Sequence, residues 1–243
     1  MADKRGDRLD WTGTVRCLPE RLDWPVKWRQ PRRVFVCSMA DLFHEDVPTE
    51  FILRVFEVMA GQHQHIFQVL TKRPERMLRL LVYGDKMACD SPEHHRLLCM
   101  MPLPNIWLGV TAENQEMWRM RVDILRQIPA VVHFVSYEPA LGSLGDVDLT
   151  DIDWVIAGGE TGPGARPAHP DWFRSLRDQC TSAGVAFWFK QRGEWAWEYP
   201  EAADLSHMDE TYLAGTHFYH VGRRRAGHLL DGREWKELPS QSG

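Results

Sequence analysis

The stretch WVIAGGE, residues 154–160, joins a short apolar run to a turn that contains two glycines and a carboxylate. The same pattern occurs six times, and each apolar run stops at a group of polar side chains. Strands buried on both faces read as continuous apolar runs, which is typical of parallel sheets. Parallel β/α folds carry their functional residues at the carboxyl ends of these strands. The six runs, each with the polar residues after it, are VFV (34–36) with Ser38, Asp41, His44 and Glu45; FQVL (67–70) with Thr71, Lys72 and Arg73; IWLGV (106–110) with Thr111, Glu113 and Asn114; VHFV (132–135) with Ser136 and Glu138; WVIA with Gly158, Gly159 and Glu160; and AFWF (186–189) with Lys190 and Gln191.

Helical patterns lie between these runs. Pro48 opens one that ends near Gly61, Asn114 is placed to cap a second, and a third opens at His169 and ends at Gly184. Alternation of strands and helices predicts an α/β fold with a parallel sheet of about six strands. The segment 158–164 lacks the order G-x-G-x-x-G of dinucleotide-binding folds, so a partial (β/α) barrel is favoured over an open doubly wound sheet.

The composition divides the chain into three parts. Residues 1–30 are polar and predict an irregular N-terminal segment, and residues 31–193 carry the alternating pattern of the partial barrel. Residues 194–243 predict a C-terminal extension with a β-hairpin formed by HFYHV, GRRRAG and HLL-DGREW. Arg223, Arg224 and Arg225 would lie near its turn, either as a solvated turn or as a contact to nucleic acid.

Charge and apolar content exclude several classes of protein. The formal net charge of −5 gives no general attraction to nucleic acid or to acidic membranes, although a local basic patch would escape this argument. No run approaches the roughly 18 apolar residues of a membrane-spanning helix, and the first twenty residues lack a signal-peptide core. We therefore expect no membrane partner and a location in the cytoplasm. The five cysteines are widely spaced and predict neither a disulfide framework nor a zinc or iron–sulfur loop.

Two of the polar groups follow the first two runs. The sequence DLFHED, residues 41–46, brings Asp41 and His44 together as metal ligands or as an acid–base pair. Alternatively, Asp41 or Asp46 caps a helix and His44 packs or hydrogen-bonds locally. Lys72 and Arg73 suit a phosphate, a carboxylate or a nucleotide, and the alternative is a salt bridge to Glu75 or to a facing carboxylate.

The later polar groups offer paired carboxylates. Glu138 and Glu160 end neighbouring strands, which suits glycoside hydrolysis, general acid–base chemistry, or hydrogen bonds to the amine and ribose of a cofactor. Alternatively, both are structural partners of Arg166 or Lys190. Gly158 and Gly159 allow close approach of the backbone to a ligand, or only a tight turn. Lys190 and Gln191 would reach the same place, and Lys190 is either a Schiff-base nucleophile or an ion-pair partner.

Several long strings resemble a known family. They are SMADLFHEDVP, FQVLTKRPERM, NIWLGVTAENQ, FVSYEPALG, IDWVIAGGETGPGARPAHPDW, FKQRGEW and DGREW, and they extend from about residue 15 to about residue 238. In this order they resemble the phage and prophage "gp thirty-seven/gp sixty-eight" family, also described as three-cysteine-motif proteins. The resemblance implies a radical-SAM-like partial β/α barrel whose N-terminal cysteine motif holds an iron–sulfur cluster. It also implies S-adenosylmethionine (SAM) as cofactor and a methyltransferase-like partner.

This chain departs from the family at that motif. Its members begin with three closely spaced cysteines, whereas Cys17 and Cys37 stand twenty residues apart. A cluster needs three thiolates at one locus, so we expect no cluster in this chain alone. Three explanations stay open: the sequence is a fragment or the product of a mis-started gene, a separate chain carries the cysteine motif, or the protein has lost redox chemistry and kept a binding role. Nucleic acid or a nucleotide is the expected substrate, with a non-catalytic phage accessory protein as the alternative function. From their chemistry alone, the candidate catalytic residues are Asp41, His44, Lys72, Glu138 and Glu160; the cofactor-binding residues are Thr111, Glu138, Gly158, Gly159 and Glu160; and the substrate-binding residues are Lys72, Arg73, Lys190 and Gln191.

Overall fold

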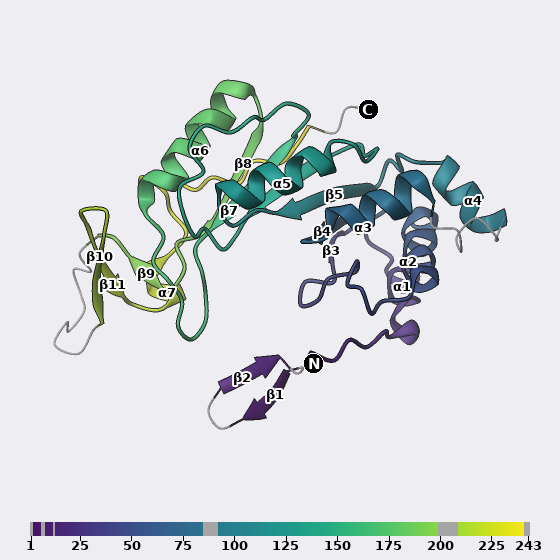
Figure 1. Cartoon of the computed structure of the whole chain (residues 1–243), viewed down its shortest axis with the longest axis horizontal. Coiled ribbons are helices and arrows are strands. Elements are labelled where there is room, and N and C mark those ends of the chain that lie inside the picture. Colours follow the sequence, from purple (N-terminus) through teal and green to yellow (C-terminus); the bar gives the residue numbers. More distant parts are fainter. Residues whose placement is uncertain (1, 6–7, 12, 85–91, 199–208, 241–243) are drawn as a thin grey trace. The chain divides into compact units, whose positions relative to one another are not determined.

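The computed structural model describes residues 2–5, 8–11, 13–84, 92–198 and 209–240 (Figure 1). It contains six parallel strands in one sheet, in the order β3-β4-β5-β6-β7-β8. Each strand lies beside its neighbour in the chain, without the reversal of strand order that defines a doubly wound sheet. The predicted α/β fold of the partial-barrel type is therefore confirmed. The six strands are β3 (Arg33–Val36), β4 (Ile66–Thr71), β5 (Ile106–Thr111), β6 (His133–Tyr137), β7 (Trp154–Gly158) and β8 (Ala186–Gln191).

The helices between the strands begin and end where the sequence indicates. The Asn114 side chain caps α5, because its Oδ1 accepts a hydrogen bond from Met117 N at 2.9 Å. His169 caps α6, and Gly184 ends that helix in the left-handed conformation, with φ of 71°. Pro48 is the N-cap of α2. The helices are α2 (Thr49–Gly61), α3 (Pro74–Leu78), continued by the π-helical turn η2 (Arg79–Tyr83), α4 (Pro92–Cys99), α5 (Gln115–Leu125) and α6 (Pro170–Ala183).

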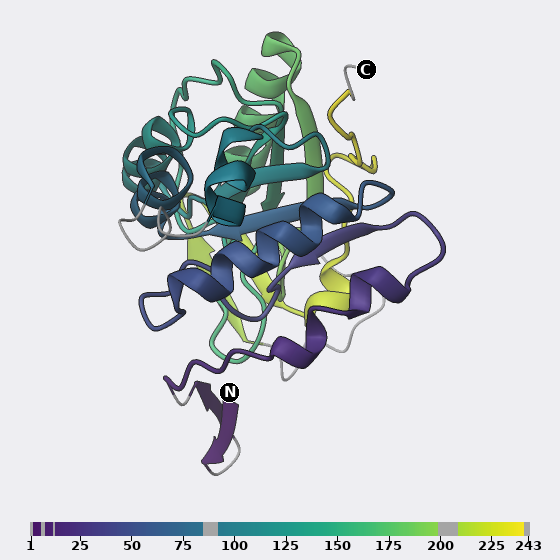
Figure 2. The same ribbon diagram turned by 90° about the vertical axis from the view of Figure 1, so that its right-hand side faces the viewer.

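The chain forms two compact units. The first comprises residues 1–110 and 123–133, and the second comprises residues 111–122 and 134–243. In the first unit α2 buries Ile52, Leu53 and Phe56, and Figure 2 shows this helix in front of β3 and β4. In the second unit α6 lies along β7 and β8, and the rings of Phe173 and Phe189 meet edge to face at 4.9 Å. Every residue of β5, β6 and β7 is buried, as their continuous apolar runs predict.

A separate antiparallel sheet of three strands lies near the C-terminus, in the order β10-β11-β9. It consists of β9 (Trp195–Ala196), β10 (Glu210–Leu213) and β11 (Thr216–His220). The predicted hairpin extension is confirmed, but its turn lies at Ala214 and Gly215, both with positive φ. The arginines form a one-turn helix after the hairpin instead, α7 (Arg223–Ala226). The segment ETYL supplies the other strand of the hairpin, with Glu210 and Tyr212 exposed and Thr211 and Leu213 half-buried.

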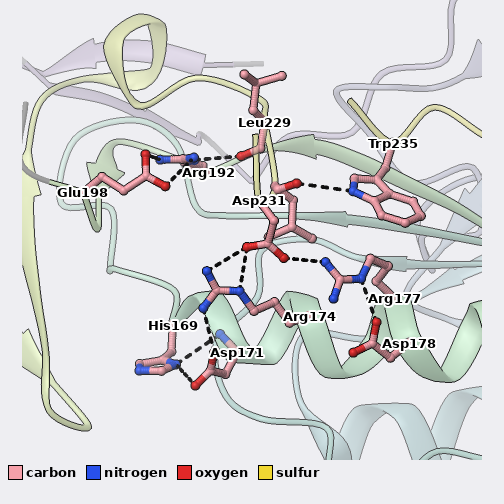
Figure 3. Close-up of polar contacts among 11 residues, drawn as sticks. His169, Asp171, Arg174, Arg177, Asp178, Arg192, Glu198, Leu229, Asp231 and Trp235 are labelled. Carbon is pink, nitrogen blue, oxygen red and sulfur yellow. Dashed lines mark hydrogen bonds and ion pairs between the residues drawn. The ribbon is translucent and has the colours of Figure 1, made fainter. Parts of the chain in front are cut away.

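The end of the chain covers the free edge of β8. Trp188 pairs antiparallel with Lys236, and Phe189 N donates to the carbonyl of Trp235 at 2.9 Å. The preceding turn is held by Asp231, whose carboxylate accepts hydrogen bonds from Arg174 Nε at 2.8 Å and Arg177 Nη1 at 2.6 Å, both on α6 (Figure 3). Strand pairing with β8 and two ion pairs to α6 therefore hold the carboxyl-terminal segment in place within the second unit.

The N-terminal residues form short elements. They are β1 (Ala2–Arg5), β2 (Arg8–Trp11), the 3-10 turn η1 (Pro19–Arg21) and α1 (Trp24–Lys27). The first two strands pair antiparallel. None of the helices in the described part of the chain has the length and the apolar character needed to cross a membrane.

Candidate functional site

In the first unit, the Asp41 carboxylate joins the loops that follow β3 and β4. Its Oδ1 accepts hydrogen bonds from Phe43 N at 2.9 Å and from Thr71 Oγ1 at 2.7 Å. Its Oδ2 accepts from Lys72 N at 3.1 Å and from Arg73 Nη1 at 2.9 Å. A carboxylate has about four acceptor positions, and here four donors fill them. Asp41 therefore has a structural role in holding the two strand ends together.

The His44 side chain has a different neighbour. Its Nδ1 accepts a hydrogen bond from Asp46 N at 3.2 Å and lies 3.6 Å from the Asp46 carboxylate. The backbone of the same loop is fixed by Arg76, which donates to the carbonyls of His44 and Val47. The side chains of Asp41 and His44, which the sequence suggests as a pair, are therefore held by separate partners.

The cations after β4 differ in their environment. Arg73 pairs with Asp41, and its side chain is 38% exposed. Lys72 is exposed, and its backbone N donates to the same carboxylate. The hydrogen bonds of Asp41 fix the backbone at this point. The side chains of Lys72 and Arg73 therefore extend from a fixed backbone at the carboxyl end of β4. This end of the first unit is suited to an anionic group.

In the second unit, Glu138 joins the ends of β6 and β8. Its Oε2 accepts from Lys190 Nζ at 2.9 Å, and its Oε1 accepts from Gln191 Nε2 at 3.2 Å. The Lys190 side chain is 55% exposed and that of Glu138 is 21% exposed. A ligand therefore has access to an ammonium group and to part of a carboxylate, whereas the Gln191 carboxamide that supports this carboxylate is buried. These groups suit hydroxyl and amino groups of a ligand as well as a carboxylate.

Gly159, after β7, and Gly193, after β8, serve the contact between two loops of the chain itself. A Cβ atom on Gly159 would overlap the carbonyl oxygen of Arg192, and one on Gly193 would lie 2.5 Å from the carbonyl oxygen of Glu160. Gly159 N donates to Gln191 O at 3.0 Å. The close approach for which Gly159 is needed is thus to the loop after β8. Gly158 has a different neighbour, because a Cβ there would lie 3.2 Å from Glu138 Oε1.

Glu160 is held by one arginine. Arg166 donates through Nε at 2.7 Å, through Nη2 at 2.6 Å and through its backbone N at 2.8 Å. The hydrogen bonds from Arg166 lower the pKa of Glu160, so this carboxylate stays ionised at neutral pH. An ionised carboxylate does not serve as a general acid. Glu138 and Glu160 have the two partners that the sequence suggests, Lys190 and Arg166 respectively.

Two further residues of the second unit organise strand ends. Thr111 is buried, and its carbonyl accepts a hydrogen bond from Arg121, which also pairs with the buried Glu113 at 2.8 Å. Glu194 was missed by sequence reasoning. Its Oε1 accepts from Gly162 N at 2.9 Å and its Oε2 accepts from Arg223 N at 2.7 Å. The sequence carries no signal for this role, because both partners are backbone groups far along the chain.

The described cysteines differ in burial and environment. Burial raises the pKa of Cys180 on α6 to about 12, which disfavours the thiolate that a cluster requires. Burial, together with the neighbouring Asp41 and Cys17, also raises the pKa of Cys37. Cys99 is exposed, and Cys89 lies outside the described residues. Within the described part of the chain, no three or more His, Cys, Asp or Glu side chains are grouped so as to hold a metal ion.

Comparison with known proteins gives one match. A family model described as "Protein of unknown function (DUF5131)" matches residues 2–239. Neither a curated protein nor a solved structure matches the chain.

Proposed function

The chain belongs to the DUF5131 family of proteins of unknown function, and we propose that it is the SAM- and substrate-binding part of a radical-SAM-like enzyme. Its substrate would be a nucleotide or a nucleic acid, and its setting a phage or prophage protein in the host cytoplasm. The observation that carries the proposal is the contact of Glu138 with Lys190 and Gln191 at the carboxyl ends of β6 and β8. This is where parallel β/α folds place their functional groups.

The residues of the second unit suit the polar groups of SAM. Glu138 would accept hydrogen bonds from the ribose hydroxyls or from the amino group, and Gln191 would keep its carboxylate in place. The backbone of Gly158 lies beside the Glu138 carboxylate, because a Cβ atom there would come within 3.2 Å of Glu138 Oε1. Gly159 and Glu160, the next two residues, would complete the cofactor-binding turn. SAM supplies an adenosyl group and a methionine group for the chemistry, and this chain would bind and orient them.

The first unit would bind an anion. Lys72 and Arg73 follow β4, and Arg73 presents a planar fork that matches carboxylate and phosphate oxygens. They would hold a phosphate of the substrate. The cysteine motif that the family resemblance implies would come from a separate chain.

Titration with SAM, measured by calorimetry, tests this assignment. Glu138→Gln keeps the shape of the side chain and removes its charge. Loss of a hydrogen bond to a charged group costs about 1.5–3 kcal/mol, so we expect SAM affinity to fall at least about tenfold. Glu116→Gln is the matched control, because Glu116 is an exposed carboxylate on α5, and this variant should bind like the wild type. Absence of SAM binding by the wild type, alone and with a three-cysteine segment added, would refute the proposal.

The hydrogen bonds of Asp41 and Glu160 favour a second candidate function, that of a non-catalytic accessory protein. Hydrogen bonds within the protein occupy both carboxylates, so two of the candidate catalytic groups already have structural roles. A non-catalytic accessory protein that acts with a methyltransferase-like partner would need them only for stability. In that case Glu138→Ala and Lys72→Ala would leave both the phage phenotype and partner binding unchanged. Loss of the phenotype with intact partner binding would favour the enzyme.

A further inference from the structure

Helix α7 presents three consecutive arginines on a fixed backbone. Arg223, Arg224 and Arg225 are all exposed, whereas Ala226 at the end of the same turn is only 4% exposed. The Glu194 carboxylate accepts the hydrogen bond of Arg223 N at 2.7 Å, and the Glu194 carbonyl accepts from Gly222 N at 3.0 Å. The turn is therefore anchored through its backbone, and the three guanidinium groups extend into solvent.

These guanidinium groups differ from other arginines of the second unit. Arg166, Arg174, Arg177 and Arg192 each lie 2.6–3.1 Å from a carboxylate. Among the described residues, no carboxylate forms an ion pair with the side chains of residues 223–225. Three adjacent like charges repel one another, and in a chain with a net charge of −5 they create a local positive potential. Such a potential suits a ligand that carries several negative charges.

The sheet next to α7 offers an aromatic surface. Tyr212 on β10 is 72% exposed, and one face of its ring stacks on His217 of β11, with centroids 4.3 Å apart and planes at 15°. His217 also contacts Tyr219, with centroids 4.4 Å apart. The neighbours of Tyr212 thus hold its ring on one face, and its high exposure leaves the remainder of the ring accessible. A ring held in this way is suited to stack with a planar ligand.

The aromatic and basic groups belong to one part of the second unit. Strand β11 pairs with β9, and the residue before β9 is Glu194, which holds the start of α7. From His217 to His220 at the end of β11 the strand advances about 10 Å. The side chains of a helix diverge by about 100° per residue, so the three arginines point in different directions. This arrangement suits successive phosphates along a chain better than one compact anion.

We propose that Tyr212 and Arg223–Arg225 form a binding surface for single-stranded nucleic acid. The arginines bind backbone phosphates, and a base stacks on Tyr212. A single strand is favoured over a duplex because its bases are free to leave their neighbours and stack on a side chain. An acidic peptide would use the arginines but would leave the tyrosine without a partner. The inference goes beyond the proposed function, since this surface requires neither SAM nor a chemical step.

Fluorescence anisotropy with a labelled twelve-nucleotide oligo-dT or oligo-U tests the proposal on the full chain. We expect Arg223→Ala/Arg224→Ala/Arg225→Ala to weaken binding at least about tenfold and to reduce the slope of log K against log salt by about 2, as for three phosphates on a single strand. Tyr212→Ala should weaken binding about tenfold and leave that slope unchanged. Arg224→Glu alone should weaken binding severalfold, and circular dichroism should show that each variant is folded.

Matched controls separate the surface from general charge and exposure. Arg54→Ala/Arg96→Ala/Arg119→Ala removes the same number of exposed arginines from α2, α4 and α5 and should change affinity less than about twofold. Tyr83→Ala removes a tyrosine that is 70% exposed and should have no effect. Three results would overturn the proposal: no binding by the wild type at low salt, equal loss in the control variants, or equal affinity for a duplex of the same length. SAM titration of the same variants is a separate readout, so failure here leaves the proposed function testable.

Discussion

Gly159 leaves no room for a side chain, because a Cβ atom there would overlap the carbonyl oxygen of Arg192. Gly159 follows β7, and Arg192 follows β8. The two loops are also joined by the hydrogen bond from Gln191 Nε2 to the Gly159 carbonyl at 2.8 Å. Since Gln191 also donates to Glu138, this contact fixes the amide that supports the candidate site.

Gly159→Ala should therefore lower the stability of the fold. The overlap is with backbone, which does not move as a flexible side chain would, and overpacking of this kind costs about 1–3 kcal/mol. Urea unfolding measures the change. Gly142→Ala is the matched control in the same unit, because a Cβ there meets nothing within 4 Å and the backbone φ is not positive. Equal stability of the two variants would show that the loops move apart without loss.

Asp231 should contribute to stability in two ways. It accepts hydrogen bonds from Arg174 and Arg177 on α6, and it adopts a φ of 54°, which Asp and Asn tolerate better than other residues with side chains. Asp231→Asn loses the charge, and Asp231→Ala loses both contributions. The carboxylate is 38% exposed, so solvent screening limits the charge term to about 1 kcal/mol. We expect the thermal unfolding midpoint to be highest for the wild type, lower for Asp231→Asn and lowest for Asp231→Ala. Asp178→Ala, the control, should lower the midpoint less than either variant of Asp231.

Glu160 should make the free energy of unfolding depend on pH in the acidic range. Its pKa in the folded state is lowered by Arg166, so the stability it contributes is fully present above the unfolded pKa of about 4.3. That contribution is lost as the pH falls through the lower folded pKa. Urea midpoints measured from pH 7 to pH 3 should show wild type above Glu160→Gln at neutral pH and a difference that narrows below about pH 4. A constant difference across this range would contradict the ion pair with Arg166.

Much of the fold can be predicted from the sequence, because the residues that determine it act locally or recur at a regular spacing. The runs at β5, β6 and β7 are apolar throughout because both faces of these strands are buried. Asn114 and Gly184 mark helix ends through contacts within a few residues. β10 was not predicted, because its residues alternate between exposed and half-buried and its partner strand decides its conformation.

The sequence predicts the candidate site only in part. The sequence placed polar groups at strand ends and offered Arg166 or Lys190 as partners for Glu138 and Glu160. The choice between these partners depends on how the loops after β7 and β8 fold, and spacing along the chain carries no information about that. The same limit applies to Asp41, because its four donors come from residues up to 32 positions away. Residue types thus predict the kind of chemistry, and long-range contacts decide which groups remain available for it.

The cysteines give a direct test of the core of the second unit. Cys180 is buried on α6, and its pKa of about 12 keeps it as an unreactive thiol at pH 8. Cys99 on α4 is exposed and should react with iodoacetamide in the native protein. We expect mass spectrometry of briefly alkylated protein to find Cys99 modified and Cys180 intact, and both modified after unfolding in urea. If Cys180 were modified as fast as Cys99 in native buffer, α6 would have to separate from β8 frequently. That result would contradict the stable packing of Phe173 against Phe189.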